Sequence, residues 1–302
     1  MLLIQDRFSK QAGRLREEFD RVYQDPRQAS SKRFAWDWWH VPGQYTLLRT
    51  PAQPFFSQAV WKKLESELLE FGQKTLGCTS ITPPWMSCYV EGCRQEIHAD
   101  VPHGPFAFVF SLTPWKNRKF TGGETVILGD AVLDWWSNFT SLKGVEREHL
   151  FKTVPSDFNR LTVFDPRVPH GVSEVRGTLD PREGRLVIHG WFTDPRPHIE
   201  GGLPAARTAE VINEYLGVRL AQVLESAPPL HGTWVVRLTV SPSGKVTQVR
   251  RLVDTVVALD RGQDAQEWVH SLTRALPADF RAIQFPKSKS GGSITLPLLF
   301  RS

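Results

Sequence analysis

A histidine and an aspartate lie two residues apart in the segment Gln95-Glu96-Ile97-His98-Ala99-Asp100. Side chains two apart on an extended strand project from the same face, because successive side chains alternate in direction. His98 and Asp100 could therefore bind one metal ion together. A third ligand from a distant strand would complete a set of two histidines and one carboxylate, which leaves coordination positions open on a ferrous ion for a co-substrate and O₂.

The triplet His-x-Asp occurs often by chance, so the surrounding sequence has to carry this interpretation. Four further features accompany the triplet in a fixed order along the chain. They are Tyr89 and Gly92 ahead of it, the Gly122-Gly123-Glu124 loop, the turn from Pro169 to Val172 with His170, and a strand from Arg185 that ends in Gly190-Trp191-Phe192. The five features in order are far more specific than any one of them.

This ordered set resembles the iron- and 2-oxoglutarate-dependent dioxygenases, in particular their prolyl-4-hydroxylase-like branch, over roughly residues 80 to 195. The resemblance implies a double-stranded β-helix, or jelly roll, that uses Fe(II), 2-oxoglutarate and O₂. It also implies the hydroxylation of a C–H bond, most often in a prolyl or other residue of a protein or peptide. A free amino acid or a small metabolite is the alternative substrate.

Carried over residue by residue, the resemblance implies that His98, Asp100 and His170 hold Fe(II). Arg185 would pair with the distal carboxylate of 2-oxoglutarate. Arginine suits this task because its planar guanidinium meets a carboxylate with two parallel hydrogen bonds.

Further candidates for the pocket lie near the first metal ligand and on the strand of Arg185. Tyr89 is expected to donate its hydroxyl to the same carboxylate, and Trp191 to form a wall. His189 has the strand parity of Arg185, so it can face the same cavity. Val187 departs from the family pattern, in which a serine often stands two residues after the arginine. The hydrogen bond of that serine would have to come from elsewhere.

Two rivals compete with these assignments. His103 could bind the metal, but it follows Pro102 and precedes Gly104-Pro105, which is typical of a turn. Arg176 could be the anchor of the co-substrate, since it lies six residues after His170. It precedes Gly177 at a predicted turn, however, and is expected to be solvated.

A length of 302 residues predicts about two domains. The composition is ordinary for a globular protein, with 40% hydrophobic residues, except for 11 Trp, most of which lie before residue 192. A net charge of +5 is mild and does not require a nucleic-acid partner.

Compartment and membrane association can also be predicted. Cys78, Cys88 and Cys93 form no Cys-x-x-Cys pair, which favours reduced thiols in the cytoplasm. The apolar start is too short for a signal peptide, because Asp6 interrupts it. No window approaches the roughly 18 apolar residues of a membrane span. We therefore expect a soluble, cytoplasmic protein.

The first region is expected to place helices before a sheet. Apolar residues at helical spacing predict helices over about 8–24 and 54–76, with Gly77 as the stop. Residues 85–195 alternate between Val- or Phe-rich runs and Gly, Pro or Asp, which suits an antiparallel barrel or sandwich. The aromatic run 34–40 is either a core edge or a rim of the pocket. The insert 133–154 is either a surface loop or a lid.

A linker from Asp194 to Pro204, rich in Pro and Gly, divides the chain into predicted domains 1–200 and 201–302. The second is predicted to be a small α+β domain. Its elements are a helix over about 208–224, a hairpin around Ser241-Pro242-Ser243-Gly244, a helix containing 267–272 and a closing strand over 291–300.

Residues 205–302 resemble, roughly, the C-terminal domain of TonB-like energy transducers. The hairpin Ser241 to Val246, the pair Phe285-Pro286 and the last strand to Phe300 carry the likeness. It implies a module that binds a protein or peptide, often by strand addition, or that dimerises. A non-catalytic protein that acts through this module is the alternative of a different class. The presence of all three candidate metal ligands, and of Arg185, in the first region argues against a non-catalytic protein.

Overall fold

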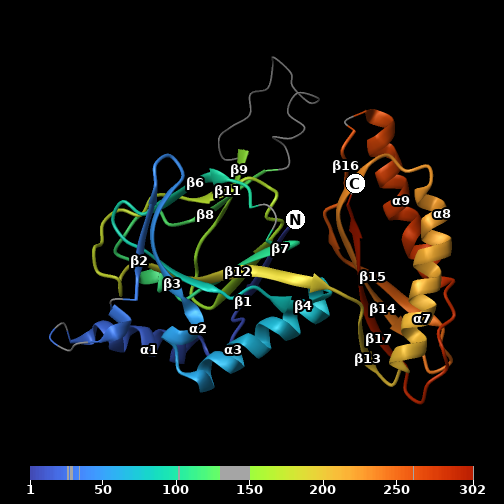
Figure 1. Ribbon diagram of the computed structural model, residues 1–302, viewed down its shortest axis with the longest axis horizontal. Helices are drawn as coiled ribbons and strands as arrows, with labels where there is room; N and C mark the ends of the chain where they lie inside the picture. The colour runs from blue at the N-terminus through green and yellow to red at the C-terminus, as the bar shows by residue number, and fades with distance from the viewer. Residues whose placement is uncertain are drawn as a thin grey trace. The chain divides into compact units, whose positions relative to one another are not determined.

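The computed structural model describes residues 1–25, 27, 30–33, 35–100, 103–129, 150–260 and 262–301 (Figure 1). The chain forms two compact units. The first comprises Leu2–Glu67 and Ile81–Phe192, and the second comprises Leu68–Ser80 and Thr193–Ser302. A division into independently folding domains after residue 200 stays a prediction.

The first unit consists mainly of antiparallel strands, which curl around an interior (Figure 1). Its strands are β1 (Leu2–Asp6), β2 (Asp37–Val41), β3 (Tyr45–Pro51), β5 (Trp85–Tyr89), β6 (Arg94–His98), β7 (Phe106–Ser111), β8 (Thr125–Leu128), β9 (Phe151–Val154), β10 (Arg160–Phe164), β11 (His170–Val172) and β12 (Arg185–Pro195). Hydrogen-bonded neighbours follow the order β1-β10-β7-β12-β5-β3-β6-β11-β8-β9, and β2 pairs with β3. The curled antiparallel sheet forms a half-barrel, which is the kind of architecture expected for a jelly roll.

Helix α1 (Ala12–Gln24) buries Ala12, Leu15 and Phe19, which recur at helical spacing. It begins later than the predicted residue 8 because the preceding backbone is bound elsewhere. The amide of Ser9 donates to Asn159 Oδ1 at 2.8 Å, and its hydroxyl accepts from the amide of Gln11 at 2.9 Å.

The second predicted helix is interrupted. It consists of α2 (Ala52–Phe55), α3 (Gln58–Phe71) and a π-helical turn η2 (Gly72–Leu76). The break lies at Ser57, whose amide and hydroxyl donate to the carboxylate of Glu18 on α1 at 2.7 and 2.5 Å. Gly77 ends the helix with a φ of 66°, so the predicted stop is in the left-handed conformation that favours glycine.

Two predicted features fall partly outside the described residues. Of the insert 133–154, only residues 150–154 are described, and they include β9. Phe34 of the aromatic run lies outside as well. The described part of that run divides its roles: Trp36 packs against Phe19 and Phe55, while Trp39 lines the cavity discussed below.

The second unit contains a sheet in the order β13-β17-β14-β15, with β16 paired to β14. Its strands are β13 (His198–Gly201), β14 (Leu230–Val240), β15 (Val246–Asp254), β16 (Val257–Ala258) and β17 (Gly292–Phe300). Strand β4 (Cys78–Ile81), which follows η2, pairs with β12 and is not part of this sheet. The predicted hairpin is β14–β15. Gly244 in its turn has a φ of 85°, and a Cβ there would meet the carbonyl oxygen of Phe285 at 2.0 Å.

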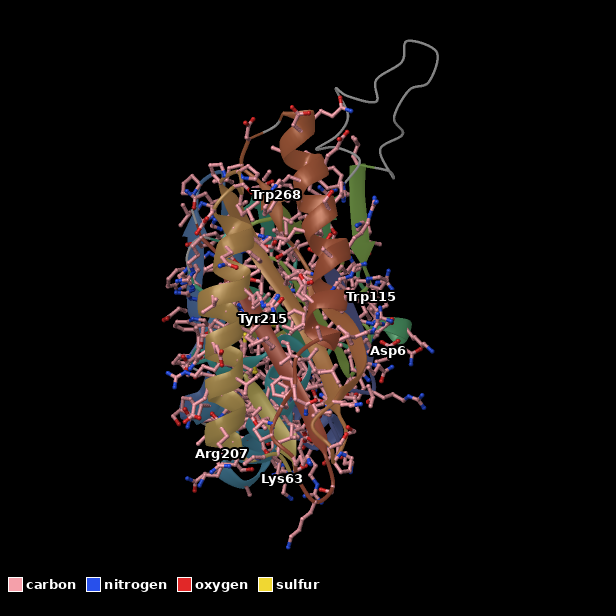
Figure 2. The ribbon with its side chains drawn as sticks, turned by 90° about the vertical axis from the view of Figure 1, so that its right-hand side faces the viewer. Asp6, Lys63, Trp115, Arg207, Tyr215 and Trp268 are labelled. Carbon is pink, nitrogen blue, oxygen red and sulfur yellow. The ribbon has the colours of Figure 1, made fainter. Side chains whose placement is uncertain are left out.

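Helices α7 (Ala205–Glu214), η4 (Tyr215–Leu220), α8 (Ala221–Leu224) and α9 (Gln263–Arg281) cover one face of this sheet (Figures 1 and 2). Tyr215, labelled in Figure 2, packs its ring against Phe280 of α9 with centroids 4.9 Å apart. Phe280 in turn stacks on Trp234 of β14. These contacts form a core for the second unit, and its likeness to a TonB-like domain stays a prediction.

The three cysteines are free and buried. Burial raises the pKa of Cys88 to about 12, so this thiol stays protonated near neutral pH. Among the described helices, none combines the length and the apolar character needed to cross a membrane.

Candidate metal centre and co-substrate pocket

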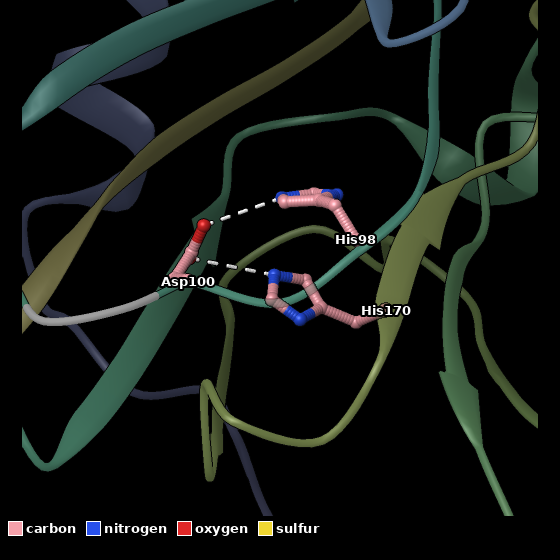
Figure 3. Close-up of side chains that lie close together, drawn as sticks. All are labelled: His98, Asp100 and His170. Atoms are coloured by element: carbon pink, nitrogen blue, oxygen red, sulfur yellow. Dashed lines mark ion pairs between the residues drawn. The ribbon is translucent and has the colours of Figure 1, made fainter.

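Strand pairing brings the three predicted metal ligands together. His98 ends β6, and His170 begins β11 directly opposite it in the antiparallel register. The amide of Asp100 donates to the carbonyl of Pro166 at 2.9 Å, which returns the chain toward the segment before His170. One ligand atom from each of the three residues lies within 4.8 Å of the others. Figure 3 shows the three side chains converging on one point.

Hydrogen bonds orient both imidazoles for metal binding. Nδ1 of His98 lies 2.8 Å from the carbonyl of Glu96, and Nδ1 of His170 lies 3.0 Å from the carbonyl of Val168. A carbonyl only accepts, so Nδ1 donates in both rings and Nε2 is the nitrogen left to bind a metal. In His98 this Nε2 also lies 3.2 Å from the side-chain amide nitrogen of Gln95. These Nε2 atoms face Asp100, with N···O distances of 3.3 Å for His98 and 3.5 Å for His170.

The charge state of Asp100 also suits a ligand. Burial raises the pKa of its carboxyl, but the interactions with the His170 and His98 side chains outweigh this and hold the pKa well below its usual range. The carboxylate is therefore ionised near neutral pH. For His98, burial lowers the pKa, and the contacts with Asp100 and the Glu96 carbonyl more than reverse this. Metal and proton then compete for the same His98 nitrogen.

A cavity of about 760 Å³ adjoins these ligands. Alternate residues of three neighbouring strands line it, as expected for the inner face of a curled sheet. They are Leu47 and Arg49 on β3, Trp85, Ser87 and Tyr89 on β5, and Arg185, Val187, His189 and Trp191 on β12. The predicted metal ligands, Arg185, Tyr89, His189 and Trp191 thus share one cavity.

Arg185 is a buried cation in this cavity, with only 1% of its surface exposed. Its Nη2 donates to Thr125 Oγ1 at 3.1 Å, and its guanidinium lies 4.6 Å from the ring centroid of Tyr89. Among the described residues, no acceptor contacts its Nε and no carboxylate forms an ion pair with it. Burial accordingly lowers the pKa of Arg185. A buried charge without a counterion is costly, so this guanidinium fits an anionic ligand.

The hydroxyl that Val187 lacks is available on neighbouring strands. Val187 pairs with Ser87 on β5 and with Ser111 on β7. The Ser87 hydroxyl lies in the cavity, 2.8 Å from Nε2 of His189, and Thr125 supplies a second hydroxyl at Arg185. Neither Ser87 nor Thr125 was identified as a pocket residue from the sequence. The alternation of side chains along the strand of Tyr89 would have indicated Ser87.

Neither rival residue belongs to the cluster of candidate metal ligands. Arg176 is exposed and pairs with Glu174 at 3.1 Å, away from the cavity lining. His103 does line the cavity, but its ring packs against Trp191 with centroids 4.4 Å apart, and it is not part of the ligand cluster.

His189 predicts a distinct pH dependence of stability. Burial lowers its pKa to about 4, with Arg185 and Arg49 adding to the effect and Asp100 opposing it. In the unfolded chain the pKa is about 6.5, so acid protonates the unfolded state first and stability falls as pH falls through this window. We expect the wild type to lose about 2–3 kcal/mol more free energy of unfolding than His189→Gln between pH 7 and pH 4. Urea unfolding with a chelator present measures this, and equal losses in both proteins would contradict it.

The chain matches no protein-family model and no curated protein. Solved structures to which the chain has a partial similarity include a prolyl-4-hydroxylase of Pseudomonas putida, a non-haem α-ketoglutarate-dependent epimerase, SnoN, of nogalamycin biosynthesis, and a viral collagen prolyl hydroxylase of Paramecium bursaria Chlorella virus-1. The Pseudomonas structure has 17% sequence identity and a TM-score of 0.44, and the alignment covers 64% of this chain and 91% of that one.

The other two similarities are of the same order. The epimerase has 15% identity and a TM-score of 0.41, with 63% of this chain and 76% of that chain covered. The viral hydroxylase has 15% identity and a TM-score of 0.38, with 63% and 94% covered.

Proposed function

We propose that the protein is an Fe(II)- and 2-oxoglutarate-dependent dioxygenase that hydroxylates a C–H bond. One observation carries this proposal: a two-histidine, one-carboxylate cluster and a buried arginine that pairs with no carboxylate among the described residues face the same cavity. The cluster fits Fe(II) with positions left open, and the arginine fits the distal carboxylate of a keto acid.

Each residue has a defined task. His98, Asp100 and His170 would hold the metal through Nε2, a carboxylate oxygen and Nε2. When bound, Fe(II) with 2-oxoglutarate and O₂ supplies the oxidation, in which one oxygen atom enters the substrate and the other enters succinate as CO₂ leaves. Arg185 would fix 2-oxoglutarate, with Tyr89 and Thr125 beside it. Trp191 would wall the pocket and exclude water.

Two classes of substrate are compatible with the proposed function. A prolyl or other residue of a protein or peptide is one class, and a free amino acid or small metabolite is the other. A cavity of about 760 Å³ has the size of a small-molecule site and holds either a small molecule or one inserted residue beside the co-substrate.

Succinate formation tests the function directly. Purified protein with Fe(II), 2-oxoglutarate and ascorbate should convert 2-oxoglutarate to succinate and CO₂, and pools of peptides or amino acids should accelerate the conversion. Omitting Fe(II) or adding a chelator should stop it, because the open coordination positions are needed for O₂. Protein that binds neither Fe(II) nor 2-oxoglutarate would favour the non-catalytic alternative.

We further propose that residues 201–302 bind a partner or a second copy of the chain. Strand β15 is at an edge of the second sheet, where unpaired backbone groups can accept another strand. A dimer that persists after residues 201–302 are removed would contradict a dimerising role, and unchanged turnover of a native protein substrate would contradict a presenting role.

A further inference from the structure

A second arginine, Arg49, faces the same cavity as the candidate metal centre. It lies on β3 in register with Ser87 of β5, which is in register with Val187 of β12. Arg49 therefore belongs to the row of inward side chains next to the row of Arg185 and Tyr89. The charge of Arg49 also acts on His189, as do those of Arg185 and Asp100, so the four groups share one electrostatic environment.

Two indole rings hold the guanidinium of Arg49. It lies over the ring of Trp39 and 4.1 Å from the ring centroid of Trp85. Flat rings on both sides limit its motion and leave its donor edge as the part that can reach a ligand.

No anionic partner satisfies Arg49 within the described part of the chain. Its Nε is buried without an acceptor, and no described carboxylate forms an ion pair with it. Asp37 lies opposite on β2 but is exposed to solvent. Burial lowers the pKa of Arg49, and Tyr45 and Asp37 offset this only in part. A partly buried cation left in this state is costly, which favours a missing anion over a purely structural role.

A charge count identifies where that anion comes from. Fe(II), the Asp100 carboxylate, doubly charged 2-oxoglutarate and the Arg185 guanidinium cancel one another. Glu96 also lines the cavity, but its carboxylate pairs with Arg94 at 2.7 Å. His189 is neutral near pH 7, so Arg49 is the remaining uncompensated cation among the described charged residues that line the cavity. The substrate is the one component of the complex that this count does not include, so the substrate is the component that can supply the anion.

We propose that Arg49, held between Trp39 and Trp85, binds a carboxylate of the substrate. This inference rests on the proposed function and narrows its substrate to an organic acid. The aromatic walls also favour an apolar or planar body next to that carboxylate. The carboxylate can belong to a free small acid or to the C-terminus of a peptide. An uncharged residue within a peptide would leave Arg49 unpaired.

The experiment measures binding to the full-length protein by calorimetry, without O₂ and with Mn(II) in place of Fe(II). Saturating 2-oxoglutarate first occupies Arg185. The probes are two matched pairs: N-acetylphenylalanine with its amide, and a hexapeptide with a free C-terminus with its amidated form. We expect an acid of at least one pair to bind about tenfold or more tightly than its amide, as for a charge-assisted pair. Quenching of tryptophan fluorescence provides an independent signal, because Trp39 and Trp85 flank the site.

Variants assign that preference to Arg49. Arg49→Gln should remove the acid-over-amide preference and leave the affinity for 2-oxoglutarate unchanged. Arg49→Lys should keep part of it, because the charge remains while the planar fork is lost. Arg176→Gln is the matched control, since its exposed guanidinium pairs with Glu174 outside the cavity.

The outcomes separate this proposal from the proposed function. A preference that needs Arg49 in one pair supports the proposal and identifies the source as a small acid or a peptide terminus. Equal binding of acids and amides, or a preference that survives Arg49→Gln, overturns it. If 2-oxoglutarate itself does not bind, the proposed function fails, and the acid and amide probes still decide whether Arg49 binds carboxylates. If Arg49→Gln is insoluble, the reduced preference of Arg49→Lys decides.

Discussion

Replacing His98 or Asp100 by alanine is expected to abolish Fe(II) binding and the metal-dependent consumption of 2-oxoglutarate. Each variant removes one of three donors that lie within 4.8 Å of one another. Asp100→Ala also removes the group that both imidazole Nε2 atoms face. Loss of an outer hydrogen-bond partner alone typically weakens a metal site about 10- to 100-fold, so loss of a ligand should exceed this.

Metal affinity is best measured by competition with a chromophoric chelator, together with succinate formation. His103→Ala is the matched control, because this histidine lines the same cavity but packs against Trp191 outside the cluster. It should keep full metal affinity. Wild-type turnover in both ligand variants would exclude the three-residue site, and loss of binding in His103→Ala would place the metal elsewhere in the cavity.

The three candidate ligands, which cluster in the structure, could be proposed from sequence because each lies in a short local pattern. His98 and Asp100 are two residues apart, at the end of β6 and just beyond it, and His170 lies in a short segment with a recognisable pattern. The helix of residues 54–76 shows the limit of such reasoning. Its apolar spacing is continuous, but Ser57 breaks it through hydrogen bonds to Glu18, 39 residues away in sequence. No local pattern contains that contact.

Arg49, Ser87 and Thr125 show the same limit in the cavity. Alternation indicates that Arg49 and Ser87 each face one side of a strand, but only the pairing of β3 with β5 places them in one row. Thr125 reaches Arg185 from β8, 60 residues earlier in the chain. Residues that contact ligands from one strand are thus visible in sequence, whereas residues assembled by register across strands need the fold.

Replacing Arg185 by leucine is expected to raise the KM for 2-oxoglutarate strongly while metal affinity stays nearly unchanged. The variant removes a charge-assisted pair in a buried pocket, which should cost about 2–4 kcal/mol, or roughly 30- to 1000-fold in affinity. Anaerobic calorimetry gives the affinity without catalysis. Arg176→Leu is the control, because that guanidinium pairs with Glu174 at the surface. A larger effect of Arg176→Leu would mean that Arg176 is the anchor.

The stability of the Arg185→Leu variant distinguishes ligand binding from a structural role. Arg185 is 1% exposed, and no described carboxylate pairs with it, so the empty protein bears the desolvation cost of a buried charge. Leucine removes that cost and leaves behind two partners, the Thr125 hydroxyl and the Tyr89 side chain. We therefore expect the free energy of unfolding without ligand to stay equal or to rise.

Saturating 2-oxoglutarate should stabilise the wild type but not the variant, because only a ligand that binds the folded state shifts unfolding. A variant that is destabilised without ligand, yet is still stabilised by 2-oxoglutarate, would show that Arg185 supports the fold and that the co-substrate binds elsewhere.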